Sequence, residues 1–475
     1  MLGLFGTLNL AARSLQTQMT GVEVSGQNLA NVNTTGYSRQ RVDIQTSADV
    51  TTAIGPEGTG ANAVAIQQLV NSLLNNQIQS QQSTAGYWNA QQSALQSAET
   101  NLNEFLSGTG SSSSTSSSAD STTSSGLSSQ LSGLFSAFQS LAASPTSMTA
   151  RQAVINQAQN LASTFNQVDR QLNTLHNALN NSLSNDVDSA NQLLSDIASL
   201  NSEISSAEFN GGTANDLMDA REQDLENLSH LVSIQTSTDT GNSVNVSIGG
   251  QSLVSGNQVL DTLQTYDAGS GQLLVQTATG GVPFTLSGGS IRGTIDARDG
   301  ALATMRSSLN TLASTLITQV NTIHSGGYSL TGSSGANFFN GSGSNNITVN
   351  QSLADNPALL QASGSSTATG DNSVALALAQ LASAAQTGLN NQTFGDSYTQ
   401  TVAGLGDALQ TANDQVTNQT AVTNMLQTQR GSVSGVNVDE EMTNLMGFQR
   451  AYEASAQLVT TINTLLGDTL AMKTG

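Results

Sequence analysis

The feature that most restricts the fold is an apolar pattern of helical period that runs from residue 150 to residue 208. Apolar residues recur every three or four positions along it, from Leu161 and Phe165 to Ile197 and Ile204. A continuous helix over this span would be about 80 Å long at roughly 1.5 Å per residue. Only 4 of the 475 residues are proline, so long helices are rarely interrupted. The pattern predicts a rod rather than a globule.

The two ends of the chain carry a second helical pattern, which alternates steps of four and three residues. Its main positions are Leu8, Leu15, Met19, Val22 and Leu29 near the N-terminus and Met442, Leu445, Tyr452, Val459, Leu466 and Leu470 near the C-terminus. Because ends that share this period can pair, we expect both termini at one tip of an elongated molecule. Gly26, Gln449 and Asn463 interrupt these seams, so we expect the ends to be poorly ordered in the free subunit and to fold when neighbours cover them.

Between these helical regions the pattern changes to a period of two. Residues 232–372 contain short alternating runs separated by glycine-rich turns, which are typical of strands, and one helical run near 296–324. The Ser/Thr/Gly tract at 107–129 predicts a flexible loop, and residues 37–66 predict a loop with weak strands. The predicted fold is mainly α with a β-rich insertion: an elongated rod of long α-helices with paired N- and C-terminal coiled-coil helices.

These patterns divide the chain into three nested parts. Residues 1–36 and 437–475 form the predicted terminal coiled-coil domain. Residues 37–231 and 373–436 form a long-helix rod domain that includes the Ser-rich loop. Residues 232–372 form a β-rich outer domain, which also carries the helical run described above.

Charge and composition exclude several classes of partner. The chain has 12 basic and 33 acidic residues, a net charge of −21, and Lys473 is its sole lysine. Nucleic-acid binding needs clustered Lys and Arg, so no nucleic-acid partner is expected. There is no cysteine, which excludes disulfides and thiolate metal sites. No run approaches the roughly 18 apolar residues of a membrane span, and residues 1–6 have neither the basic stretch nor the apolar run of a cleaved signal.

No group of residues predicts a catalytic, cofactor or metal site. The histidines His176, His230 and His324 are far apart in sequence, and we interpret them as surface or half-buried helix residues. Residues 58–63 fit a dinucleotide-binding pattern, but no strong strand precedes them and no clear helix follows. The acidic residues 439–441 are explained by the first turn of a helix, where the helix dipole favours them. The chain is therefore expected not to be an enzyme.

The stretch from Ser25 to Gln40, SGQNLANVNTTGYSRQ, resembles the N-L-A-N-x-x-T-x-G signature of the axial proteins of the bacterial flagellum. Its continuation at 36–40, GYSRQ, and the run VDEE at 438–441 followed by FQR at 448–450 are most similar to the FlgK family of hook-associated proteins. Short sequences similar to those of that family also occur at 150–153 and 217–221. The motif residues are Asn28, Leu29, Ala30, Asn31, Gly36, Tyr37 and Ser38.

The resemblance implies a structural subunit that forms the junction layer between the hook and the filament. It implies an extracellular location, export of the unfolded chain through the flagellar type III channel, and guidance by the export chaperone FlgN. The implied partners are further copies of the chain in a ring or helical layer, the hook protein, and the second hook-associated protein of the junction. The terminal helices would form the inner tube, and the β-rich domain would face outward.

Two other interpretations remain open. The first is another axial protein of the same class, a hook subunit or a flagellin, although the GYSRQ and VDEE runs argue against it. The second is an enzyme carried on the flagellum, with its activity in residues 232–372, although no catalytic constellation is visible there.

Overall fold

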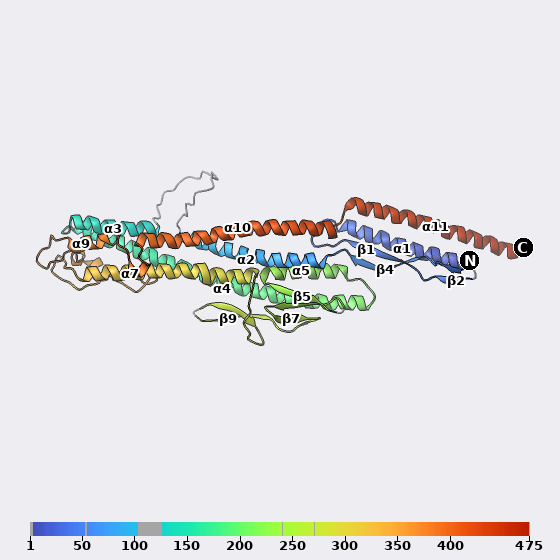
Figure 1. Cartoon of the computed structure of the whole chain (residues 1–475), viewed down its shortest axis with the longest axis horizontal. Helices are drawn as coiled ribbons and strands as arrows, with labels where there is room; N and C mark the ends of the chain where they lie inside the picture. Colours follow the sequence, from blue (N-terminus) through green and yellow to red (C-terminus); the bar gives the residue numbers. More distant parts are fainter. Residues whose placement is uncertain (1–2, 53–54, 103–125, 240, 270, 475) are drawn as a thin grey trace.

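The computed structural model describes residues 3–52, 55–102, 126–239, 241–269 and 271–474. The molecule is elongated, its long helices lie along one axis, and both termini lie at the same tip (Figure 1). At this tip α1 (Leu4–Ala30) packs along α11 (Val438–Thr474). The prediction of a mainly α fold with a β-rich insertion and paired terminal helices is therefore confirmed.

The rod is built from three long helices, α2 (Ser72–Leu102), α4 (Met148–Phe209) and α10 (Phe394–Ser434). The 62 residues of α4 correspond to about 93 Å at roughly 1.5 Å per residue. This helix confirms the rod predicted from its apolar period. The shorter α5 (Asn215–Leu231) packs back against α4, and α10 runs along the rod to the point where α11 begins (Figure 1).

The predicted loop at 107–129 is wrong at its C-terminal end. Helix α3 (Leu127–Ala143) begins there, and Leu127 is buried in the core. The serines before it concealed the start of an apolar pattern that continues through Leu131, Leu134 and Phe138. The rest of the predicted loop, up to residue 125, lies outside the described residues.

The larger core lies at the end of the rod away from the termini. Its buried side chains come from α3, the first half of α4, α10, α7 (Ala303–Ser325) and the short α9 (Ser373–Gln380). Helix α6 (Gly289–Asp296) continues through a π-helical segment (Ala297–Leu302) into α7, so the helix predicted near 296–324 begins earlier. The segment after α7 also packs in this core. It contains the strand pair β11 (Phe339–Asn340) and β12 (Thr348–Val349), the helix α8 (Gln351–Asp355) and the 3-10 turn Pro357–Leu359. A further 3-10 turn, Thr387–Leu389, precedes α10.

A second core lies between the C-terminal half of α4, α5 and two small antiparallel sheets on one side of the rod (Figure 1). The four-stranded sheet has the order β5 (Ile234–Thr238), β6 (Val244–Ile248), β7 (Gln251–Ser255) and β8 (Gln258–Val259). The other sheet pairs β9 (Leu263–Asp267) with β10 (Leu273–Thr277). The residues 232–372 are thus divided between the two cores: strands β5 to β10 belong to the second, and α7 with its following segment, which includes β11 and β12, belongs to the first.

An antiparallel hairpin connects the tip to the rod. Strand β1 (Gln40–Thr46) pairs with β4 (Ala61–Gln68), with a bulge between Asp43 and Ile44, and the shorter β2 (Val50–Thr52) pairs with β3 (Gly55–Glu57). The hairpin packs along α1. It is more regular than the loop with weak strands that the sequence predicted, because apart from Val42 its inward positions carry mainly small or polar residues such as Gln40 and Ala63, which give little apolar alternation.

Arg151 lies at the start of α4 and is 1% exposed. It belongs to the short FlgK-like sequence at 150–153. Its Nε and Nη2 donate to the carbonyl of Pro145 at 2.9 and 2.7 Å, and its Nη1 donates to the carbonyl of Leu360. A buried charge is tolerated only when its donors are satisfied. These carbonyl bonds supply that compensation and tie the start of α4 to the segment after α7.

His324, at the end of α7, is also fully buried, so interpreting it as a surface or half-buried residue is wrong. Its Nε2 accepts from the backbone N–H of Gln361 at 3.0 Å, so the ring proton lies on Nδ1, which donates to the carbonyl of Ala336 at 2.8 Å. Burial lowers the pKa of His324 from 6.5 to about 4; the hydrogen bond to Ala336 opposes this shift and the Arg151 charge adds to it. The imidazole is therefore held neutral.

This burial predicts a loss of stability in acid. Between pH 6.5 and pH 4 the unfolded imidazole binds a proton that the folded one does not. The free energy of unfolding should therefore fall as the pH drops through this window, by up to about 1.4 kcal/mol per pH unit. Urea unfolding across the window, compared between the wild type and His324→Gln, measures this contribution. The variant should lose stability less steeply with acid than the wild type; equal slopes in the two proteins would contradict the prediction.

Candidate assembly interface

The terminal pair is held by small side chains where α1 and α11 approach most closely. A Cβ atom on Gly21 would lie 2.6 Å from the Phe448 ring, so a glycine is needed at this position. The hydroxyls of Ser14 and Ser455 share a hydrogen bond of 2.8 Å. Further toward the C-terminus, Ile462 of α11 is 4% exposed. The contact is therefore close but contains few large apolar groups.

The predicted seam residues mostly lie at the margins of this contact. Those that are half-buried are Leu8, Leu15, Val22, Leu29, Leu445, Val459 and Leu466. Those that are exposed are Met19, Met442, Tyr452 and Leu470. The fully buried positions of α1 are instead Ala11, Thr17, Gly21, Val24, Ser25 and Asn28.

The terminal pair consequently leaves bulky apolar side chains uncovered. Besides the seam residues, α1 exposes Phe5 at 73%, and α11 exposes Met446, Leu458, Leu465 and Met472 at 41–78%. Large exposed apolar surfaces of this kind mark interaction sites in soluble proteins. The uncovered surface of α1 and α11 is the candidate assembly interface.

The motif residue Asn28 joins α1 to the hairpin. Its Nδ2 donates to the carbonyl of Gln40 at 2.8 Å, and its Oδ1 accepts from the Gln40 backbone N–H at 2.9 Å, so the side-chain amide pairs with the strand as a second backbone would. The Tyr37 hydroxyl donates to the same Oδ1 at 2.8 Å. Burial, with Asp216 and other nearby carboxylates, raises the pKa of Tyr37 to about 12, which keeps this donor protonated.

The remaining motif residues end the helix and turn the chain. The Asn31 backbone N–H and side-chain Nδ2 both donate to the carbonyl of Gln27 at 3.1 Å. Leu29 is half-buried and Ala30 is exposed. Gly36 has a φ of +83°, a left-handed conformation that costs glycine little. The motif therefore encodes a helix end and a turn that deliver the chain into β1.

The same turn attaches the tip to the rod through α5. The Ser38 backbone N–H donates to Asp219 Oδ2 at 2.9 Å. The Gln40 side chain donates to Asp216 Oδ1 at 3.0 Å and accepts from Asn215 Nδ2 at 3.2 Å. Asp219 belongs to the FlgK-like stretch at 217–221, so two matched regions that are far apart in sequence meet at this joint.

Arg39 attaches the start of α11 to the same turn. Its side chain donates to Glu441 Oε1 at 2.7 Å and to Glu440 Oε2 at 2.8 Å, and its backbone N–H donates to the carbonyl of Ser434 at 2.8 Å. Asn437 Oδ1 accepts from the backbone N–H groups of the first turn. The acidic run at 439–441 is thus explained by a capped helix start and an ion pair.

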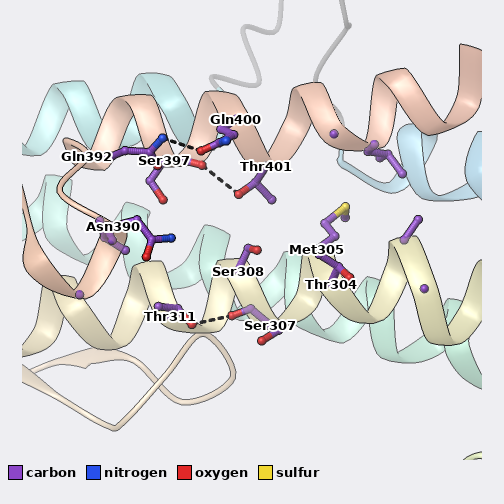
Figure 2. A pocket seen from close by; sticks show the side chains of 16 residues that line it. Thr304, Met305, Ser307, Ser308, Thr311, Asn390, Gln392, Ser397, Gln400 and Thr401 are labelled. Carbon is purple, nitrogen blue, oxygen red and sulfur yellow. Dashed lines mark hydrogen bonds between the residues drawn. The ribbon is translucent and has the colours of Figure 1, made fainter.

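The described residues contain no group of three or more His, Cys, Asp or Glu side chains placed to hold a metal ion. A groove between α7 and α10 is lined by hydroxyl and amide side chains, among them Ser308, Thr311, Asn390 and Gln400 (Figure 2). No ionisable side chain lines this groove, so it offers neither a general acid nor a general base. In the part of the chain that the structure describes, no helix is both long and apolar enough to cross a membrane.

Comparisons with known proteins identify the family. Residues 113–339 match the family model described as the flagellar hook-associated protein FlgK helical domain, and residues 432–472 match that of the flagellar basal body rod FlgEFG protein C-terminal region. Over 514 aligned residues the chain is 29% identical to flagellar hook-associated protein 1 of Bacillus subtilis (strain 168), and the alignment covers 98% of both chains. The chain therefore resembles FlgK proteins over nearly its whole length.

Other comparisons agree with this resemblance. The chain is 23% identical to flagellar hook-associated protein 1 of Escherichia coli (strain K12), over 96% of this chain and 98% of that one. The structure of the flagellar hook junction protein FlgK from Burkholderia pseudomallei has the same fold, with a TM-score of 0.63 and 17% identity over 76% of this chain and 100% of that chain. In agreement with the names of these relatives, the chain is a structural component of the flagellum and not an enzyme.

The close contact at Gly21 predicts opposite effects for two glycines of α1. Gly21→Ala places its methyl group against the Phe448 ring and should destabilise the terminal pair by about 1–3 kcal/mol. Gly26 has open space at its Cβ position, so Gly26→Ala should stabilise α1 by about 0.5–1 kcal/mol through its higher helix propensity. Amide hydrogen exchange along α1 would measure both changes. Equal protection in the two variants would refute the assignment of Gly21 as the contact point.

The Asn28 amide predicts a specific loss at the hairpin. Asn28→Asp replaces the donor to the Gln40 carbonyl by an oxygen in a fully buried site, which should cost about 1–3 kcal/mol or more. Urea unfolding gives the stability, and exchange of the Gln40 amide locates the damage. The matched control is Asn33→Asp at an exposed turn position, which should change stability by less than about 0.5 kcal/mol; a comparable loss in both variants would argue against a special role of Asn28.

Proposed function

We propose that this chain forms the layer that joins the hook to the filament, and that it assembles through α1 and α11. The observation that carries the proposal is the apolar surface that the terminal pair leaves uncovered, including Met19, Met442 and Leu470. The solved relative from Burkholderia pseudomallei is named a flagellar hook junction protein, which supports the same role for this chain.

The proposed partners follow from a place in that layer. Copies of the chain contact one another in a ring or helical layer, the hook protein lies on one side, and a second hook-associated protein lies on the other. The subunit reaches this extracellular position as an unfolded chain through the flagellar export channel, and the chaperone FlgN guides it. The absence of cysteine is compatible with this route, because no disulfide has to be broken before export.

We assign a separate structural role to each of the three predicted parts of the chain. Residues 1–36 and 437–475 form the inner tube, residues 37–231 and 373–436 form the rod around it, and the strands within 232–372 face outward. The bond network at Asn28, Ser38 and Arg39 supports a defined angle between tube and rod, since it joins α1, α5 and α11.

Single charges on the uncovered surface test the assembly role. Leu15→Asp or Leu466→Asp should abolish incorporation and leave the monomer soluble, because an unpaired carboxylate buried against a neighbouring subunit costs more than the roughly 2–7 kcal/mol of a neutral polar group. Both side chains are half-buried in the single chain, so circular dichroism of the monomer should be unchanged. The matched control is Leu376→Asp on α9, where an exposed leucine lies at the other end of the rod. Normal incorporation of both tip variants would refute assembly through these helices.

A clean deletion tests the junction role itself. Cells should carry hooks without filaments and release unassembled flagellin into the medium, and a labelled copy should restore filaments and mark the layer next to the hook. Absence of hooks would favour a hook subunit instead, and normal filaments would contradict the proposal.

A further inference from the structure

Methionine is concentrated among the exposed apolar side chains of this chain. Of its 9 methionines, all but Met1 lie in the described residues, and six of these are exposed by 47–78%: Met19, Met148, Met425, Met442, Met446 and Met472. Four of these six lie on α1 and α11, the candidate assembly interface. In contrast, Met305 lies in the core of the rod and is 3% exposed. The chain therefore presents its thioethers on the surface that its neighbours would cover.

Met442 and Met446 stand out within this group. They lie one helical turn apart on α11, so their side chains share one face of the helix. They are 48% and 47% exposed. Met442 directly follows Glu441, whose ion pair with Arg39 anchors the start of the helix. The two sulfur atoms therefore lie on a well-anchored part of the interface and not at a fraying end.

The thioether is the side chain of this protein that peroxide oxidises most readily, because the chain contains no cysteine. A sulfur lone pair attacks one oxygen of hydrogen peroxide, the O–O bond breaks, and a sulfoxide S–O bond forms. The departing oxygen takes up a proton and leaves as water, so sulfur loses two electrons and the peroxide gains them. A flexible apolar side chain thereby becomes polar, and a methionine sulfoxide reductase can restore it with two thiols.

We propose that Met442 and Met446 form a reversible oxidation site that controls assembly of the free subunit. This inference rests on the proposed assembly through α1 and α11. In the free subunit both sulfurs are open to peroxide, and their sulfoxides place two strong dipoles on a surface that must lose its water on assembly. In the assembled layer the neighbouring subunit covers the same sulfurs. Oxidation therefore blocks incorporation but does not release subunits that are already in place.

The test compares purified subunits before and after treatment with hydrogen peroxide. Peptide mass spectrometry should find one added oxygen at Met442 and at Met446, and none at the buried Met305. The treated subunit, added to cells that lack it, should restore filaments roughly tenfold less often than the untreated subunit, because two sulfoxides per interface must be desolvated. Methionine sulfoxide reductase with a dithiol should return the activity. Peroxide added after incorporation should leave the filament count unchanged.

Two variants make the outcome specific to this pair. In the double variant Met442→Leu with Met446→Leu, treated and untreated samples should differ by less than about twofold, although Met19 and Met472 can still be oxidised, because the proposal assigns the loss to this pair alone. The matched control Met425→Leu removes an exposed methionine of α10 and should keep the full sensitivity. Full incorporation of a wild-type subunit that carries both sulfoxides would overturn the proposal, as would a double variant that remains as sensitive as the wild type. Failure of the assembly role would appear separately, as normal incorporation of Leu466→Asp without any oxidant.

Discussion

The helices and strands of this molecule are joined by asparagine side chains. Each of these asparagines lies on a helix and forms two hydrogen bonds with the backbone of the first residue of a strand. The amide of Asn28 pairs with Gln40 at the start of β1. The same arrangement recurs three times, with Asn191 on Leu263, Asn201 on Val244 and Asn321 on Phe339, and in each case one donor and one acceptor bond of 2.8–3.1 Å is formed. A side-chain amide carries a donor and an acceptor with the spacing of a peptide group. Each such pair of hydrogen bonds, here called an Asn fork, therefore takes the place of the bonds that a neighbouring strand would make. Among the described residues, four of the five sheets are joined to a helix in this way, and the pair β2–β3 is the exception.

This arrangement suits a chain that has little apolar material. Hydrophobic residues make up 37% of the sequence, less than the roughly 45–50% of a typical globular domain. Thin cores bury limited area, so specific polar bonds must fix the register of the elements. Buried polar groups are costly when they lack partners, and each side-chain nitrogen and oxygen of Asn28 and Arg151 takes part in at least one hydrogen bond. The long helices give the molecule its length, and the polar hydrogen bonds determine which segments pack against one another.

The sequence predicted the parts of the fold that depend on a long apolar period. Helices α4, α5, α10 and α11 and the pairing of the two ends could all be recognised in this way. The Asn forks could not, because an asparagine within a helix indicates only a weak helix former until its strand is known. Gly26 was the glycine that interrupted the expected seam, yet Gly21 is the one that meets Phe448. Periodicity shows which residues share a face; the element that covers this face is decided by tertiary structure.

The placement of the seam residues follows from what a subunit of an assembly requires. Were Leu15 and Leu466 fully buried between α1 and α11, the pair would be stable alone and would offer its neighbours little apolar area. The chain instead closes the pair with Gly21, Ser14 and Ser455, and it anchors α11 through Arg39. The bulky side chains then remain at the margins, where a single chain covers them only in part. A terminal pair built in this way is held in position by polar bonds, and it keeps apolar area that further subunits would cover in the proposed assembly.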